Sequence, residues 1–186
     1  VNANLKLELK NTVRPAVSGK AIVGQTLTAN PGTWAQPDAA FTYRWLAGGK
    51  VIANATAPTL TVSKSHLGKK IQVEVTATKA PYAPSTKVSK ATATVGYASS
   101  ISVKSKAKGN GKVEFAVKVK SRSKAARGKV AVYANGKKLK TATLSSKGKV
   151  TIKVSKQTRG EQTYTLKYSG SGKAAATSKT TKVTVK

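Results

Sequence analysis

Residues 113–120 read Val-Glu-Phe-Ala-Val-Lys-Val-Lys, with a large apolar residue at every second position. A β-strand points successive side chains to opposite faces of its sheet, so this alternation predicts a strand that buries one face and exposes the other. The same period occurs at residues 71–77 and 150–154. Because helical patterns are almost absent and turn signals recur at intervals of about ten residues, the sequence predicts an all-β sandwich or barrel.

The composition narrows the class of protein. The chain has 186 residues, enough for one large domain or two small ones. It contains no Cys, which excludes disulfides, zinc–thiolate sites and a cysteine nucleophile. It also contains no Met, and we expect it to be a piece of a larger protein that is secreted or cell-wall-associated. No apolar run approaches the roughly 20 residues of a membrane span, and no stretch reads as a signal peptide.

We predict two tandem immunoglobulin-like β-sandwiches, residues 1–97 and residues 98–186, joined by a short linker at residues 96–100. Leu5, Leu7 and Leu9 alternate, either as the first strand of the first module or as the last strand of a preceding one. Further strands of the first module are expected at residues 20–29, 41–45, 50–52, 59–62, 71–77 and 88–95. Strands of the second are expected at residues 101–103, 113–119, 130–132, 139–144, 150–154, 164–168 and 183–185. Hairpin turns are predicted at Gly48-Gly49 and Asn135-Gly136.

The net charge is strongly positive and unevenly distributed. The chain carries 35 Lys and Arg against 5 Asp and Glu, a formal net charge of +30. Residues 1–97 hold +9 of this charge and residues 98–186 hold +21. Charge of one sign weakens a compact fold by self-repulsion. Either a polyanionic partner such as nucleic acid, teichoic acid or an acidic membrane surface favours this charge, or it reflects solubility or a general lysine bias.

A series of motifs runs through most of residues 14–95. They are Gly19, Ala21, Val23-Gly24-Gln25-Thr26-Leu27-Thr28-Ala29, Pro31-Gly32-Thr33-Trp34, Tyr43-Arg44-Trp45-Leu46, Thr59-Leu60-Thr61-Val62 and Leu67-Gly68-Lys69-Lys70-Ile71. In these motifs the first module resembles a family of immunoglobulin-like repeats from secreted and wall-associated proteins of high-GC Gram-positive bacteria.

The second module shows a looser set of motifs. They are Gly128-Lys129-Val130-Ala131-Val132-Tyr133, Asn135-Gly136, Thr141-Ala142-Thr143-Leu144 and Tyr164-Thr165-Leu166-Lys167-Tyr168-Ser169-Gly170. This module resembles a more loosely defined bacterial immunoglobulin-like repeat. The resemblance implies a spacer, stalk or accessory module beside a catalytic domain. Because members of such families are often neutral or acidic, the lysine content departs from the pattern, and the resemblance implies no partner.

The aromatic residues are expected to build the cores. Trp45 shares one strand face with Phe41 and Tyr43, and Trp34 is expected to close one end of the same core. A sugar-stacking surface would instead need several aromatic residues on an outward face. The predicted core aromatics are Trp34, Tyr43, Trp45, Phe115 and Tyr164.

Residues suited to catalysis or metal binding do not gather in the sequence. His66 is the only His and is expected to be a surface turn residue, since a general base also needs a nucleophile or an orienting carboxylate nearby. The five acids are scattered through both modules, and Glu74 and Glu114 are expected to point outward and pair with lysines. We therefore predict that this chain is not an enzyme and has no catalytic residue, metal site, cofactor or small-molecule ligand.

The basic residues give the only positive functional signal. Alternation points six lysines outward on strands that share one sheet: Lys104, Lys112, Lys118, Lys120, Lys149 and Lys153. A loop and a hairpin add further charge at one end, through Arg122, Lys124, Arg127, Lys137, Lys138 and Lys140. Lysine lacks the bidentate fork of arginine, and outward aromatics for base stacking are few. This pattern favours diffuse, non-specific binding of an anionic polymer through counterion release.

We therefore expect a non-catalytic, extracellular accessory or spacer region that holds anionic cell-wall polymer or nucleic acid through lysine-rich sheet faces. One alternative is the substrate-tethering region of a secreted hydrolase, such as a nuclease or nucleotidase, whose catalytic domain would lie upstream. Another alternative is an adhesin stalk whose charge is incidental.

Overall fold

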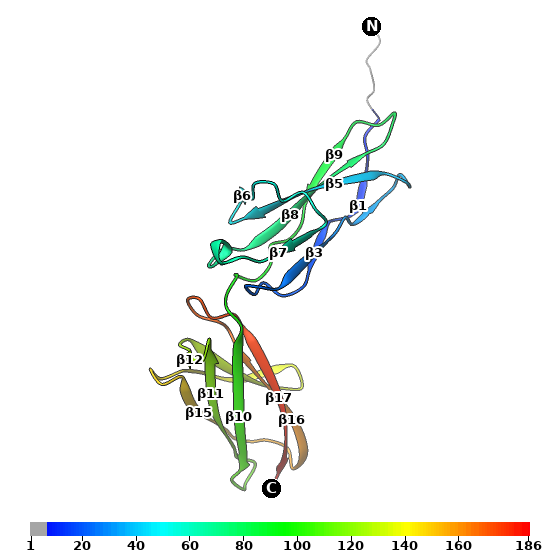
Figure 1. The fold of residues 1–186 in the computed structure, drawn as a ribbon. Helices are drawn as coiled ribbons and strands as arrows, with labels where there is room; N and C mark the ends of the chain where they lie inside the picture. The colour runs from blue at the N-terminus through cyan, green and yellow to red at the C-terminus, as the bar shows by residue number, and fades with distance from the viewer. Residues whose placement is uncertain (1–6) are drawn as a thin grey trace. The chain divides into compact units, whose positions relative to one another are not determined.

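The computed structural model describes residues 7–186, which form antiparallel sheets apart from one short 3-10 turn, η1 (Lys64–His66) (Figure 1). Two compact units divide the chain between Val95 and Gly96. The boundary after residue 97 that the sequence suggests stays a prediction. Of the expected first strand, Leu5 lies outside the described residues, and Glu8 makes an isolated bridge with Ala83.

The first unit contains two main sheets. One has the order β2 (Ala16–Ser18), β3 (Thr26–Asn30), β7 (Thr59–Thr61). The other has the order β6 (Lys50–Val51), β5 (Ala40–Ala47), β8 (Ile71–Thr78), β9 (Ser85–Val88). A separate pair joins β1 (Asn11–Val13) to β4 (Thr33–Trp34). Gly48 and Gly49, with φ angles of 60° and 80°, form the predicted two-residue turn between β5 and β6.

The second unit also contains two sheets. One has the order β10 (Ser99–Ala107), β11 (Val113–Ser121), β15 (Lys149–Val154), and the short β12 (Lys124–Ala125) also pairs with β11. The other has the order β14 (Lys137–Thr143), β13 (Lys129–Ala134), β16 (Gly160–Tyr168), β17 (Thr177–Val185). Asn135 and Gly136 form the predicted turn between β13 and β14, with φ angles of 48° and 75°.

The two units share one strand topology. In each, the first, second and fifth principal strands form a three-stranded sheet that packs on a sheet of the third, fourth, sixth and seventh. Apolar residues from both sheets of a unit meet in one core. The predicted fold, an all-β pair of tandem immunoglobulin-like sandwiches, is confirmed.

Trp45 lies fully buried in the core of the first unit, and its indole Nε1 donates a hydrogen bond to the Ala57 carbonyl oxygen at 2.9 Å. Tyr43 is half-buried and packs against the same core. Trp34 is buried in a smaller, separate cluster rather than at the end of the main core. Phe41 packs against both clusters, with its ring centroid 6.2 Å from that of Trp34.

The core of the second unit is built around Phe115 and Tyr164, both fully buried, whose ring centroids lie 5.0 Å apart in an edge-on arrangement. Burial raises the pKa values of Tyr164 and Tyr168 above the ordinary tyrosine range. Both phenols find partners: the Tyr168 hydroxyl donates to the Arg127 carbonyl oxygen at 2.6 Å, and that of Tyr164 donates to Gln157 Oε1 at 3.3 Å. These hydrogen bonds connect the segments that contain Arg127 and Gln157 to the core.

The segment expected as a strand at residues 88–95 follows β8 without forming a regular strand beyond Val88. The backbone N–H groups of Ser89 and Thr92 donate to the carbonyl oxygens of Val73 and Ile71, both at 2.9 Å. In return, the Ser89 and Thr92 hydroxyls accept the N–H groups of Val73 and Ile71, both at 3.0 Å. Side-chain oxygens replace backbone carbonyls as acceptors here. The backbone N–H and C=O groups of Ile71 and Val73 in β8 are therefore hydrogen-bonded although no regular ladder forms.

His66 is buried, with 6% of its surface exposed, and the sequence-based expectation of a surface turn residue is wrong. Its ring closes the end of η1, because Nδ1 accepts the backbone N–H of Ser63 at 3.2 Å. A ring nitrogen that accepts a hydrogen bond is unprotonated. Burial, and then the positive charge of Lys69, lower the His66 pKa below its ordinary value.

Ser89→Ala should lower the free energy of unfolding by about 1–3 kcal/mol, because the buried Val73 N–H loses its acceptor. Urea denaturation monitored by tryptophan fluorescence would measure this loss. Ser85→Ala is the matched control, since the Ser85 hydroxyl has no hydrogen-bond partner among the described residues and should change stability little. Equal losses in the two variants would contradict the role given to Ser89.

Stability should fall as the pH drops through the ordinary histidine range, about 6.5, because the fold holds His66 neutral and the unfolded chain binds the extra proton. His66→Gln should flatten this dependence, since a glutamine oxygen can accept the Ser63 N–H without titrating. Urea denaturation at a series of pH values would measure both slopes. An unchanged slope in the variant would show that another group titrates.

Candidate anion-binding surface

The outward face of the β10–β11–β15 sheet brings three of the predicted lysines together. Lys118 on β11 pairs with Ser102 on β10 and with Lys149 on β15. In the adjoining row, Ala116 pairs with Lys104 and with Thr151. Alternation causes this arrangement, because the buried residues Val113, Phe115, Val117 and Val119 turn the residues between them to solvent.

Between these lysines lies a hollow of about 610 Å³, which we call the lysine hollow. Its rim carries Lys104, Lys118 and Lys149, and the small side chain of Ala116 leaves its centre low. No acidic residue lines it. Three lysines therefore line one open space, with no counter-charge among the residues that line it.

Lys118 and Lys149 lie directly opposite each other on neighbouring strands. Like charges at such positions destabilise a sheet. The row at the other end of the hollow is partly neutralised, since Lys106 and Lys153 flank Glu114 and the Lys153 Nζ lies 3.7 Å from its carboxylate. Repulsion on this face is thus greatest at the hollow.

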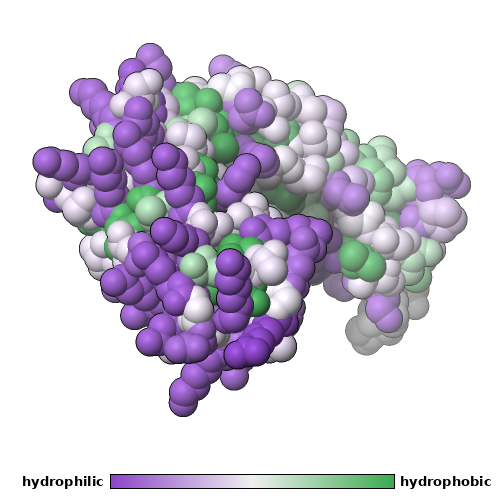
Figure 2. Space-filling view, turned by 90° about the horizontal axis from the view of Figure 1, so that it is seen from below, coloured by the Kyte–Doolittle hydropathy of each residue, from purple (hydrophilic) through white to green (hydrophobic). Residues whose placement is uncertain are grey.

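The other predicted lysines of this sheet lie outside the hollow. Lys120 pairs with Ser100 and Ala125, and Lys112 precedes β11 in the turn from β10. The hairpin residues Lys137 and Lys138 begin β14, at the edge of the second sheet and at the end of β13 away from Arg127, so the expectation that this hairpin and the Arg122 loop share one end is wrong. Lys140 lies on β14 and extends to β15, where its Nζ donates to the Lys153 carbonyl oxygen at 3.2 Å. Figure 2 shows hydrophilic side chains crowding the face seen from below, which includes the C-terminal end of the second unit in Figure 1.

Arg122, Lys124 and Arg127 line a second depression of about 490 Å³, away from the lysine hollow. Sequence reasoning missed two further residues of this depression, Tyr97 and Lys173. Alternation gives no signal for them, because Tyr97 lies in the expected linker and Lys173 lies in a turn.

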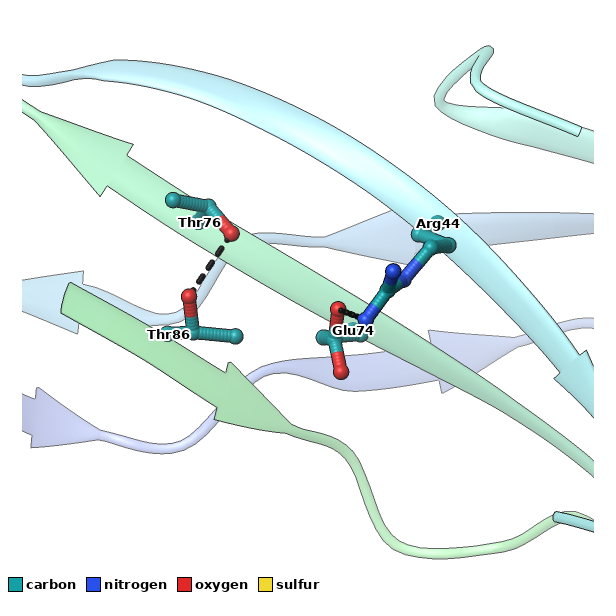
Figure 3. Close-up of polar contacts among 4 residues, drawn as sticks. All are labelled: Arg44, Glu74, Thr76 and Thr86. Atoms are coloured by element: carbon teal, nitrogen blue, oxygen red, sulfur yellow. Dashed lines mark hydrogen bonds and ion pairs between the residues drawn. The ribbon is translucent and has the colours of Figure 1, made fainter. Parts of the chain in front are cut away.

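Polar side chains pair with one another on the outward face of β5, β8 and β9 in the first unit (Figure 3). Arg44 and Glu74 pair across the strands, with Nη2 2.6 Å from Oε1, and the Thr76 and Thr86 hydroxyls lie 2.8 Å apart. These four residues line a hollow of about 450 Å³. Glu74 points outward as predicted, although its partner is an arginine rather than a lysine. Because the charges pair, this hollow offers hydroxyl groups but no excess charge.

Two findings concern other kinds of site. Within residues 7–186, no three His, Cys, Asp or Glu side chains come close enough to hold a metal ion. None of the described residues forms a helix of the length and apolar character that crossing a membrane requires.

A family model described as "Bacterial Ig-like domain (group 3)" matches residues 86–186, just over half of the chain and all of the second unit. No curated protein matches the chain significantly.

Several solved structures have a similar architecture at low identity. The fibronectin(III)-like modules of Clostridium thermocellum CbhA are 12% identical, cover 96% of this chain and 93% of theirs, and give a TM-score of 0.38. A 1.5-MDa bacterial ice-binding adhesin is 14% identical, over 97% of this chain and 65% of that one, at a TM-score of 0.34. A Ca²⁺-stabilized adhesin of an Antarctic bacterium is 14% identical. The match covers 96% of this chain and 49% of that one, at a TM-score of 0.35. The fold assignment rests on the strand topology and the family model rather than on these scores.

Lys149→Glu should raise the free energy of unfolding by about 0.5–1 kcal/mol at low salt, because it converts a repulsive cross-strand pair with Lys118 into an attractive one. The gain should shrink in high salt, which screens exposed charges. Denaturation of both proteins at low and high salt would measure it. Lys147→Glu makes the same change of charge in the preceding turn and serves as the control. An equal gain there would show that net charge, not the cross-strand pair, sets the effect.

Proposed function

Since the chain belongs to the family of bacterial Ig-like domains (group 3), we propose that it is a non-catalytic, extracellular spacer region whose second unit holds an anionic polymer. The polymer is one that carries a phosphodiester at each repeat, such as a wall teichoic acid or a nucleic acid. The binding surface is the outward face of β10, β11 and β15, centred on the lysine hollow.

The observation that carries this proposal is a comparison between the two units. The sheet of the first unit that corresponds to β10–β11–β15 is β2–β3–β7. Its exposed residues are small or carry a neutral hydroxyl or amide group, with Thr26 opposite Thr61 and Thr28 opposite Thr59. The same topology therefore forms without lysines on this face. A general requirement of the fold does not explain the three lysines around the hollow of the second unit.

The physical chemistry of the face suits a flexible polyanion. Lysine ammonium groups are point charges that attract phosphates without fixing their orientation. Neutralising a row of phosphates releases condensed counterions, which favours binding at low salt and makes it fall steeply as salt rises. The bound chain would also screen Lys118 from Lys149, so binding and folding favour each other.

The alternatives lead to different outcomes. A substrate-tethering region of a secreted nuclease would favour duplex DNA over a poly(glycerol phosphate) chain. An adhesin stalk with incidental charge would retain neither polymer. The spacer proposal expects the poly(glycerol phosphate) chain to be held at least as well as DNA.

The test uses the full chain and the triple variant K104Q/K118Q/K149Q. At about 50 mM salt we expect the native chain to retain both polymers, and the variant to bind about tenfold more weakly with a salt slope smaller by about 2–3. Fluorescence anisotropy with a labelled polymer across a salt series measures both quantities.

The matched control is K20Q/K50Q/K64Q, which removes the same charge from exposed positions of the first unit. It should weaken binding only slightly, because these lysines lie outside the proposed surface. Equal losses in the two triple variants would leave only non-specific attraction by net charge. Absence of retention by the native chain would favour the stalk.

A further inference from the structure

The basic depression of about 490 Å³ in the second unit differs from the lysine hollow in both shape and chemistry. Its walls come from Tyr97, the turn between β11 and β12, residues 125–127, and the turn at residues 171–174. Four basic residues line it and none of the five acids does: Arg122, Lys124, Arg127 and Lys173. It holds two of the three arginines of this unit, whereas the sheet face carries lysines alone.

The turn that presents Arg122 is strained. Arg122 and Ser123 have φ angles of 50° and 63°, in a two-residue connection between paired strands. Turns of this kind favour Asn-Gly, the pair that this unit uses at Asn135 and Gly136. Arg and Ser tolerate a positive φ poorly. Strain of this kind persists where the surrounding structure compensates for it, and it clusters at binding sites.

The side chain of Arg122 lies over an aromatic ring, with its Cζ 4.5 Å from the centroid of Tyr97. A cation–π contact forms no conventional hydrogen bond, so it leaves the five N–H donors of the guanidinium available. Within residues 7–186, no carboxylate pairs with Arg122. The guanidinium is therefore positioned yet free to bind an anion.

The walls of the depression are fixed to the rest of the unit. Tyr97 exchanges backbone hydrogen bonds with the turn opposite, donating to the Lys173 carbonyl oxygen at 2.7 Å and accepting from the Ala175 N–H at 2.9 Å. The Ala126 N–H donates to the Val119 carbonyl oxygen at 3.0 Å, and the buried Tyr168 hydroxyl holds the backbone of Arg127. Because these walls are held before a ligand arrives, little ordering entropy opposes binding.

We propose that this depression binds a single tetrahedral oxyanion, a phosphate or sulfate group, through the guanidinium of Arg122 with Arg127, Lys124 and Lys173 around it. Arginine's planar fork matches two oxygens of such a group at once. The inference rests on the proposed function only in taking anions as the ligands of this unit. The sheet face attracts a polymer diffusely along its length. The depression would in addition recognise one phosphate or sulfate group, such as the group at the end of a polymer.

The experiment titrates the full chain with sodium sulfate and, separately, with sodium phosphate, while sodium chloride keeps the ionic strength constant. The amide resonances of residues 121–127 and 171–174 are expected to shift together and to saturate. Whichever salt saturates at the lower concentration identifies the preferred group. Shifts that never saturate, or that centre on residues 116–118 and 149–151, would overturn the proposal.

The decisive variant is R122N/S123G, which installs the preferred turn and removes the guanidinium. We expect oxyanion affinity to fall about tenfold, while the melting temperature of the second unit rises by about 3–6 °C as the strain is relieved. R122K, which keeps the charge but not the fork, should fall between the variant and the native chain. R159N removes the remaining arginine of the unit, outside the depression, and should bind as the native chain does.

The two proposals fail separately. If K104Q/K118Q/K149Q loses polymer binding but still saturates with sulfate or phosphate, both stand. If the native chain holds polymer but R122N/S123G binds the small anion unchanged, the oxyanion site is refuted and the sheet surface is kept. If the small anion saturates but no polymer is retained, the sheet surface is refuted and the oxyanion site is kept.

Discussion

Strand alternation couples the core of the second unit to its surface charge. Val113, Phe115, Val117 and Val119 face inward on β11, so Lys118 can only face outward. A slip of one residue would exchange the two sets and bury ammonium groups in an apolar core, at a cost of several kcal/mol for each unpaired charge. The same lysines that repel one another on the surface therefore fix the register of the strand beneath them.

This coupling explains how a unit with so few acids keeps a single fold. Its two carboxylates are both paired, Glu114 with Lys153 and Glu161 with Lys182. The second pair raises the Lys182 pKa through a direct hydrogen bond at 2.8 Å, but both side chains are exposed and add little stability. The apolar core must therefore supply the stability, since the other lysines of the described residues have no carboxylate partner.

The sequence predicts the structure best where the period of a strand decides which side chains point inward and which point outward. It gave the outward direction of Lys118 and Lys149, the hairpin at Asn135, and the buried position of Trp45. It could not give the cross-strand register, which depends on pairing between residues far apart in the chain. For this reason the placement of Lys118 opposite Lys149, and of Glu114 between two lysines, came only from the structure.

The sequence did not predict the side-chain hydrogen bonds outside the strands, for a different reason. The burial of His66 depends on a side-chain cap at η1, and the irregular course beyond Val88 depends on hydroxyls that accept backbone N–H groups. Neither arrangement has a period that a sequence displays. The contact of Arg122 with Tyr97 likewise joins residues that belong to no shared pattern.

The two anion sites inferred for the second unit perform different physical tasks. A face of lysines attracts a polyanion over a distance and lets it slide, because no ammonium group prefers one phosphate over the next. The proposed site at Arg122, which lies over Tyr97, would instead select one group and fix where the chain stops. If one polymer reached both sites, binding at the first would raise the effective concentration of its end at the second, so even a weak second site would add to retention. Strain at Arg122 and Ser123 is the expected cost of placing an arginine where the backbone alone would favour Asn-Gly.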